Sequence, residues 1–324
     1  MDQARVGFIG VGGVAGGHLN ILNGFEDAEL AALCDIDEGR LKGRAEAFGV
    51  ANAYTDYREM LSAEELDAVY VCVPPFAHGQ IEEEIAAAGT ALFVEKPVEL
   101  HMEPAVRKHE AIRDAGILNT VGYCVRYLST VDDVARTLEG VQIDMALGYY
   151  MGGAPGGWWR QLNKSGGQLV EQTTHIVDTA RYLVGDVAAV GGAFAAQTPL
   201  DDSADIENVS IAHLFFENGA VGAVMSACML GRGFKTGLDI FAKGYTAEFT
   251  YGKTRVHAGG ESHEFDPNNN MYESEDRAFI DAVKTGDRSA LRVDYADAVK
   301  SLEVSLLARE ANDKRAVLET TFKG

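Results

Sequence analysis

The stretch RVGFIGVGGVA, residues 5–15, decides the fold of the first part of the chain. A short apolar run ends at Gly10, and the residues that follow fit the pattern G-x-G-x-x-A. Gly10 permits a tight turn and Gly12 lets the backbone approach a pyrophosphate, while the alanine keeps the following helix close to the strand. The N-terminus of that helix offers N–H groups and a partial positive charge to phosphates. We therefore predict a dinucleotide-binding turn, with a purely structural glycine turn as the alternative. Its expected cofactor contacts are Gly10, Gly12, Gly13 and Val14.

An acidic residue, Asp35, ends the next apolar run, at residues 29–35. A carboxylate there accepts hydrogen bonds from the adenosine ribose and repels a 2′-phosphate, so NAD is expected as the cofactor and NADP is disfavoured. Arg40 lies one turn into the next helix and leaves an alternative open. It could reach a 2′-phosphate, or it could be an ordinary solvated charge on the helix.

Strand and helix signals alternate through the first third of the chain. The expected strands are 5–10, 29–35, 67–73, 91–95 and 118–123, and the expected helices are the stretch to about 23, 38–48, 78–88 and 104–115. Strands that are apolar on both faces and separated by helices indicate a doubly wound parallel sheet. After about residue 122 the predicted strands follow one another, at 143–151, 187–197, 208–216, 220–229 and 238–251.

Asn218-Gly219 predicts a tight hairpin within this second part. Helices are expected at about 169–184, 272–285 and 294–312. The prediction is an α/β chain: an N-terminal Rossmann domain with a doubly wound parallel sheet, residues 1–122, and a C-terminal α+β domain with a large, mostly antiparallel sheet, residues 123–324. The second domain is expected to bind substrate and to form oligomers.

Length and charge limit the functions to consider. The 324 residues suit two domains, and 47% hydrophobic with 24% charged residues is an ordinary globular composition. A net charge of -21 disfavours nucleic acid and anionic membranes as partners. The four cysteines have no metal-ligand spacing, so no metal is expected. With no signal peptide and no long apolar run in view, a cytoplasmic location is the expectation.

A short motif follows one of the parallel strands: Glu95-Lys96-Pro97. Ligands bind at the carboxyl ends of such strands. A lysine there can donate a hydrogen bond to a substrate hydroxyl and stabilise an alkoxide. An ion pair at a strand end is the alternative.

A second stretch, SGGQLVEQTTHIVD at residues 165–178, reads as a helix. At 100° per residue, Glu171, His175, Asp178 and Tyr182 fall on one narrow stripe, opposite an apolar face. We expect the stripe to point away from the core of the second domain. A histidine one turn from each of two acids suits proton transfer, whereas a solvated helix face is the alternative.

Taken together, VGFIGVGGVAGGHL, CDID, VYVCVPPFAHGQI, FVEKPVEL and SGGQLVEQTTHIVDTARYLVGD resemble the Gfo/Idh/MocA family, the glucose–fructose oxidoreductase and inositol dehydrogenase group. The resemblance implies that Lys96 contacts substrate and aids proton movement, and that His175 is the acid/base. Glu171 stands where the family commonly has Asp, and the resemblance implies a role in substrate binding. The further residues that it implies are Pro74, Pro75, His78 and Glu95 along the cofactor, and Arg126, Trp159 and Arg160 on the substrate side.

These features predict an NAD-dependent oxidoreductase that moves a hydride between nicotinamide and a secondary alcohol of a sugar, sugar acid or cyclitol. The expected partner is a small polyol or sugar, and the resemblance implies a homodimer or homotetramer. Two alternatives stay open: an NAD-using glycoside hydrolase that oxidises, eliminates and reduces again, and a non-catalytic dinucleotide sensor. The latter would be expected to lack a lysine or histidine at positions 96 and 175.

Overall fold

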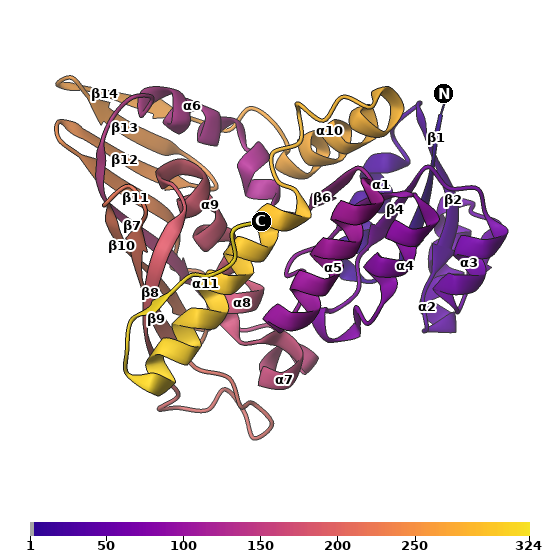
Figure 1. The fold of residues 1–324 in the computed structure, drawn as a ribbon, viewed down its shortest axis with the longest axis horizontal. Helices are drawn as coiled ribbons and strands as arrows, with labels where there is room; N and C mark the ends of the chain where they lie inside the picture. The colour runs from indigo at the N-terminus through magenta and orange to yellow at the C-terminus, as the bar shows by residue number, and fades with distance from the viewer. Residues whose placement is uncertain (1–2) are drawn as a thin grey trace. The chain divides into compact units, whose positions relative to one another are not determined.

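The computed structural model describes residues 3–324, and the chain forms two compact units (Figure 1). The first unit comprises the chain up to Glu99, then Glu103–Cys124 and Met271–Ala296. The second comprises Leu100–Met102, Val125–Asn270 and Asp297–Gly324. The expected division into two contiguous segments at residue 122 differs from this arrangement, because a late segment of the chain packs with the first unit.

The first unit is built on a parallel sheet, which within residues 3–324 has six strands in the order β3-β2-β1-β4-β5-β6. These strands are β1 (Ala4–Ile9), β2 (Ala28–Cys34), β3 (Asn52–Tyr54), β4 (Ala68–Val71), β5 (Ala91–Val94) and β6 (Asn119–Val121). The strand order reverses between β1 and β4, and ligands bind outside the carboxyl ends of strands at such a point. The predicted Rossmann fold is confirmed.

The helices of the first unit are α1 (Gly13–Leu22), α2 (Glu38–Phe48), α3 (Tyr57–Ala63), α4 (Ile81–Ala88), α5 (Met102–Ala115) and α10 (Met271–Thr285). Local chemistry sets the ends of several of these helices, although α4 begins three residues later and α5 two residues earlier than predicted. In α2, for example, the Asp37 carboxylate caps the first turn by accepting from the Arg40 N–H, and Gly49 ends the helix in the left-handed region, at φ 68°. Neither β3 nor α3 was predicted, because three and seven residues are too few for a clear period.

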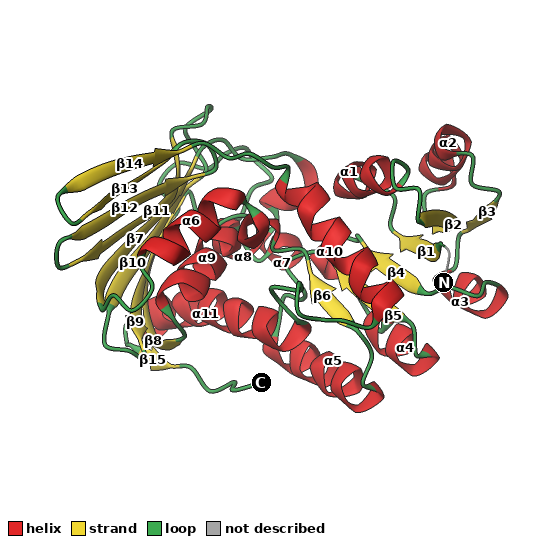
Figure 2. Ribbon diagram, turned by 90° about the horizontal axis from the view of Figure 1, so that it is seen from above, coloured by secondary structure: helices red, strands yellow, loops and turns green. Residues whose placement is uncertain are grey.

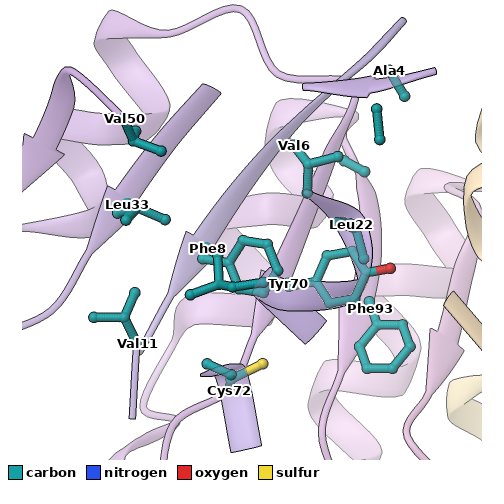
Figure 3. Close-up of a cluster of buried hydrophobic side chains, with 14 of the residues drawn as sticks. Ala4, Val6, Phe8, Val11, Leu22, Leu33, Val50, Tyr70, Cys72 and Phe93 are labelled. Atoms are coloured by element: carbon teal, nitrogen blue, oxygen red, sulfur yellow. The ribbon is translucent and has the colours of Figure 1, made fainter. Parts of the chain in front are cut away.

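Three aromatic side chains stack across neighbouring strands in the core of the first unit (Figure 3). The ring of Tyr70 on β4 lies 4.8 Å from that of Phe8 on β1 and 4.4 Å from that of Phe93 on β5, measured between centroids. The parallel register places these residues side by side. Stacked pairs of this kind add about 0.5–1.5 kcal/mol each beyond the area that they bury.

The second unit is built on a sheet that, in the described part of the chain, has nine strands in the order β14-β13-β12-β11-β7-β10-β9-β8-β15. They are β7 (Ile143–Met151), β8 (Val187–Ala195), β9 (Val209–Phe216), β10 (Val221–Ala227), β11 (Lys235–Ala242), β12 (Tyr245–Thr250), β13 (Thr254–Ala258), β14 (Glu261–Phe265) and β15 (Leu318–Glu319). Every pairing is antiparallel except β7 with β10, so the predicted mostly antiparallel sheet is confirmed.

Two tight turns in this sheet bear on the strands predicted from the sequence. The single strand expected at 238–251 is wrong, because the chain turns at Gly244, with φ 78°, and forms the hairpin of β11 and β12. The tight hairpin expected at Asn218-Gly219 is confirmed, since it joins β9 to β10 and Gly219 has φ 89°.

Helices lie on one face of this sheet, and Figure 2 shows the opposite face without a helical cover. The helices of the second unit are α6 (Ser129–Thr137), α7 (Leu162–Ser165), α8 (Gln168–Glu171), α9 (Thr174–Val184) and α11 (Tyr295–Lys314), of which the last begins in the first unit. Across residues 3–324, no helix is both long and apolar enough to span a bilayer.

Candidate functional site

The glycine turn after β1 has the shape that a pyrophosphate requires. Gly10 has φ 84°, and a Cβ there would lie 2.7 Å from the carbonyl oxygen of Cys72, so only glycine fits. At Gly12 and Gly13, by contrast, no described atom lies within 4 Å of where a Cβ would be. Open space therefore faces the N-terminus of α1, whose first turn carries no acidic residue. The partial positive charge of the helix N-terminus and the open space at the two glycines both suit a phosphate.

Asp35 is buried directly beside this turn. Its Oδ2 accepts from the backbone N–H of Val11 at 2.9 Å, and its Oδ1 accepts from the N–H of Asp37 at 2.9 Å. The guanidinium of Arg40 lies 3.1 Å from Oδ2 and also pairs with Asp37. The structure thus brings together the glycine turn, Asp35 and Arg40. Contact of Asp35 with a ribose stays a prediction.

Ile36, next in the chain, is 90% exposed at the same edge of the sheet. Ile36 is not among the residues predicted from the sequence. An isoleucine this exposed beside Asp35 offers an apolar surface to a flat adenine ring. Its position after the motif's acidic residue was the available signal.

Pro74, Pro75 and His78 follow β4, and Pro75 opens a 3₁₀ turn, Pro75–Ala77. The His78 ring is buried, and its Nδ1 hydrogen-bonds the carboxylate of Glu82. Lys108 lies 2.8 Å from the other oxygen of Glu82. Burial would raise the pKa of Glu82, but His78 and Lys108 outweigh it and lower that pKa. The histidine ring is therefore held rigidly by a charged partner.

Glu95 and Lys96 follow β5 at the edge of the sheet where the glycine turn lies. The Lys96–Pro97 peptide is cis. One oxygen of the buried Glu95 carboxylate accepts from the Lys96 N–H at 3.1 Å, and the other lies 3.0 Å from Nε2 of His18. The Glu95 side chain therefore points to neighbouring protein groups and fixes the local backbone. Contact of Glu95 with the cofactor stays a prediction.

In the second unit, two glycines lead into the predicted substrate stretch. Gly166 and Gly167 have φ 73° and 85°, and a Cβ at Gly167 would lie 2.5 Å from the Glu207 carboxylate. Arg309 pairs with that carboxylate. This crowding accounts for the Gly-Gly pair ahead of α8.

The expected continuous helix at 169–184 is wrong. It is interrupted between α8 and α9, where the Thr173 N–H bonds back to the Gln168 carbonyl at 2.9 Å. Adjacent β-branched threonines at 173 and 174 weaken helix there. Glu171 therefore ends one helix and His175 lies in the first turn of the next. The carboxylate of Glu171 accepts from the indole N–H of the buried Trp159, which orients it.

The predicted polar stripe is also wrong at Asp178. This side chain is fully buried and is held by Arg126, with N–O distances of 2.7 and 2.8 Å, and by the hydroxyl of Ser301 at 3.0 Å. Arg126 also pairs with Asp297 at 2.5 Å. Burial would lower the pKa of Arg126, but the two carboxylates raise it above its ordinary value. Periodicity placed Asp178 on the polar side because it takes no account of a buried partner.

Of the other predicted substrate-side residues, Arg160 makes an ion pair with Asp201 and donates to the carbonyl of Pro155. Trp159 packs with Ile206 and Cys228 in a small buried cluster. The substrate roles proposed for Arg126, Trp159 and Arg160 stay predictions. The structure gives the arginines internal carboxylate partners.

Two family models cover most of the chain. Residues 4–123 match the model described as "Oxidoreductase family, NAD-binding Rossmann fold", and residues 139–244 match the "GFO/IDH/MocA C-terminal domain". The chain belongs to the Gfo/Idh/MocA family of oxidoreductases. The resemblance seen in the sequence is confirmed, and with it the NAD-binding fold and the class of enzyme.

Relatives of this Gfo/Idh/MocA protein include scyllo-inositol 2-dehydrogenase (NAD(+)) of Bacillus subtilis (strain 168), 27% identical over 68% of this chain and 66% of that protein. D-apiose dehydrogenase of Paraburkholderia graminis is 30% identical over 67% of this chain and 58% of that protein. Among solved structures, levoglucosan dehydrogenase in complex with NADH has a TM-score of 0.89 at 20% identity, covering 99% of this chain and 100% of that one. That last likeness concerns the fold.

One group of buried residues in the first unit escaped the sequence analysis. His18 on α1 contacts both Glu95 and Asp276 of α10, and Tyr70 hydrogen-bonds Asp276. Glu95 and Asp276 lie 77 and 258 residues from His18 along the chain. A single histidine in the glycine-motif helix was the only signal, and it names no partner.

Proposed function

We propose that this Gfo/Idh/MocA protein oxidises a secondary alcohol of a sugar, sugar acid or cyclitol, with Lys96 and His175 handling the hydroxyl proton. The observation that carries the proposal lies in the first unit. Lys96 follows β5 at the carboxyl edge of the sheet, where no described atom crowds Gly12 and Gly13 of the glycine turn. A cation at this edge would be available to a substrate hydroxyl once a dinucleotide is bound at the turn.

The roles of the residues follow from their chemistry. NAD, when bound, accepts the hydride that leaves the carbinol carbon. The Lys96 ammonium donates a hydrogen bond to the hydroxyl oxygen and stabilises the negative charge that grows there. The His175 imidazole takes the hydroxyl proton, so the alcohol becomes a ketone with the loss of one hydride and one proton.

Substrate binding is assigned to Glu171, whose carboxylate is held by the Trp159 indole. A carboxylate with one oxygen already fixed can accept a hydrogen bond from a sugar hydroxyl through its remaining lone pairs. The names of the relatives, an inositol and an apiose dehydrogenase, support a polyhydroxylated substrate.

The test is a panel of inositols, aldoses and polyols with NAD, followed at the absorbance band of reduced nicotinamide. Net NADH formation with at least one member is expected. Lys96→Ala and His175→Ala should abolish it while NAD still binds. Substrate cleavage without net NADH would favour the glycoside hydrolase alternative instead.

We also propose that the chain forms a homodimer or homotetramer through the outer face of the second unit's sheet. Exposed and buried residues alternate along β9, so Ile211 and Phe215 point outward, and Phe215 pairs across to the exposed Val221 on β10. Apolar residues that gather on a surface typically mark an association site. Light scattering should give a mass above that of one chain, and Phe215→Lys with Val221→Lys should reduce it to the monomer. A monomeric parent protein would contradict this assignment.

A further inference from the structure

His18 lies in α1 with 1% of its surface exposed, and carboxylates face both of its ring nitrogens. Its Nε2 is 3.0 Å from Oε1 of Glu95, and its Nδ1 is 2.8 Å from Oδ1 of Asp276. Tyr70 donates to the same Asp276 oxygen at 3.2 Å. All four residues belong to the first unit.

Carboxylates against both ring nitrogens favour the charged form of the imidazole. A neutral imidazole has one donor and one acceptor nitrogen, so only the imidazolium can donate to both carboxylates. Burial on its own would lower the pKa of His18, but the charges and hydrogen bonds of Asp276 and Glu95 raise it from 6.5 to about 10. His18 is therefore a buried cation at neutral pH. Burial raises the pKa of Asp276, against the opposing effects of His18 and Tyr70, so the charge on this acid depends on its partners.

The Glu95 carboxylate has little freedom in this arrangement. Its Oε1 faces His18, and its Oε2 accepts from the N–H of Lys96 at 3.1 Å. Gly122, just after β6, also lies against this carboxylate: a Cβ added at Gly122 would be 2.8 Å from the carboxyl carbon of Glu95. The carboxylate is thus enclosed by a cation, an amide and a close backbone.

We propose that His18 is a positioning residue for Lys96: the imidazolium orients Glu95, and Glu95 holds the backbone N–H of Lys96. The inference rests on the proposed function only in that Lys96 is the residue that meets the substrate hydroxyl. It also gives α10 a part in the site, because Asp276 on that helix binds the other side of the imidazolium. Misplacing a reacting group by about 1 Å can cost roughly 100-fold in rate.

The first test compares two perturbations of the Glu95 carboxylate with one matched control. His18→Gln removes the cation, and Gly122→Ala crowds the carboxylate, because the added Cβ would lie 2.8 Å from the carboxyl carbon and from Oε1 of Glu95. The control is Asp27→Asn, because Asp27 ties α10 to the same unit through Arg277 and Lys284, each at 2.8 Å, without touching Glu95.

For His18→Gln and Gly122→Ala we expect kcat to fall roughly 10- to 100-fold with a nearly unchanged Kd for NADH. Asp27→Asn should lower Tm yet keep kcat. Equal losses of kcat in all three variants, or in none, would make His18 a structural residue and overturn the inference. If His18→Gln fails to fold, Gly122→Ala and Asp276→Asn perturb the same group of residues from other sides.

A second readout needs no turnover. Reductive methylation with ¹³C-formaldehyde labels the lysines, and the loss of one signal in Lys96→Arg assigns Lys96. Its methyl signal should move in His18→Gln and Gly122→Ala, and should stay in place in Asp27→Asn. An unmoved signal in the first two variants overturns the inference. Absence of turnover in the parent protein, with a signal that moves as expected, contradicts the proposed function alone.

Discussion

The guanidinium of Arg40 lies 3.1 Å from the carboxylate of Asp35, and the same carboxylate accepts the N–H of Val11 in the glycine turn. Asp35 therefore links the turn to the start of α2 and at the same time occupies Arg40. A 2′-phosphate placed here would meet a negative charge and an arginine that already has a partner.

Cofactor selectivity should follow from this pair. We expect NAD to bind more tightly than NADP by about 1–3 kcal/mol, the range for hydrogen bonds to charged groups, which is roughly 5- to 150-fold. Asp35→Ser removes this negative charge and one of the two carboxylate partners of Arg40, and should narrow or reverse the preference. Fluorescence titration with both cofactors measures it. Equal or tighter binding of NADP by the parent protein would mean that Arg40 binds the phosphate despite Asp35.

The glycine turn permits a test that separates binding from folding. No described atom lies within 4 Å of a Cβ at Gly12, where φ is -73°, so the protein itself has room for Gly12→Val. The valine would fill the space expected for the pyrophosphate. NAD affinity should fall by roughly 100-fold or more, about 3 kcal/mol, while Tm stays within a few degrees of the parent.

Gly10→Val is the matched contrast. With φ 84° and a carbonyl oxygen 2.7 Å from the added Cβ, it should destabilise the fold. If Gly12→Val binds NAD normally, the cofactor does not lie at this turn.

The buried ion pair of Arg126 predicts a loss of stability. Arg126→Ala leaves Asp178 buried without its cation, and breaking a buried pair costs about 3–5 kcal/mol. Urea unfolding should show this decrease in the free energy of unfolding. A variant with the stability of the parent and a raised KM would instead support Arg126 as a substrate contact.

The charge on His18 predicts how stability depends on pH. Its pKa is raised from 6.5 to about 10 in the folded chain, because Asp276 and Glu95 outweigh the effect of burial. The ionisable groups that face it are Glu95 at the end of β5, Tyr70 on β4, and Asp276 and Tyr272 on α10. Its stabilising contribution is therefore complete below pH 6.5 and is lost as the pH rises from there through about 10.

Urea unfolding at pH 6 and pH 9 measures this contribution. The free energy of unfolding should fall between these values in the parent and fall less in His18→Gln. Parallel pH profiles would show that His18 is neutral in the folded chain.

The sequence predicted the first unit well where apolar runs and glycines act locally. The range of α2 and the turn at Gly10 both follow from capping and φ preferences. Prediction from the sequence failed where a side chain's position depends on a partner that is distant along the chain. The helical period predicted that Asp178 lies on an exposed polar face, yet an ion pair with Arg126 holds its side chain in the core.

Long-range packing also accounts for what the sequence could not place. The helix at 272–285 was predicted, but no periodicity shows that Asp276 reaches His18 in the first unit. The single strand expected at 238–251 was wrong because only two residues, Lys243 and Gly244, separate β11 from β12, which is too short a break to interrupt the strand pattern. The chemistry of Lys96, Glu171 and His175 was predicted from motif and resemblance. The contacts of His18 with Glu95 and of Trp159 with Glu171 needed the structure.

The most direct test of the account is stopped-flow hydride transfer in His175→Ala and Lys96→Ala, with a substrate identified from the panel. Each variant should lose about 10²–10⁴-fold in the rate of hydride transfer, the range for a lost acid/base group, and both should bind NAD as the parent does. A His175→Ala enzyme that keeps most of its hydride-transfer rate across the pH range would contradict the account, because the proton would then leave through another residue.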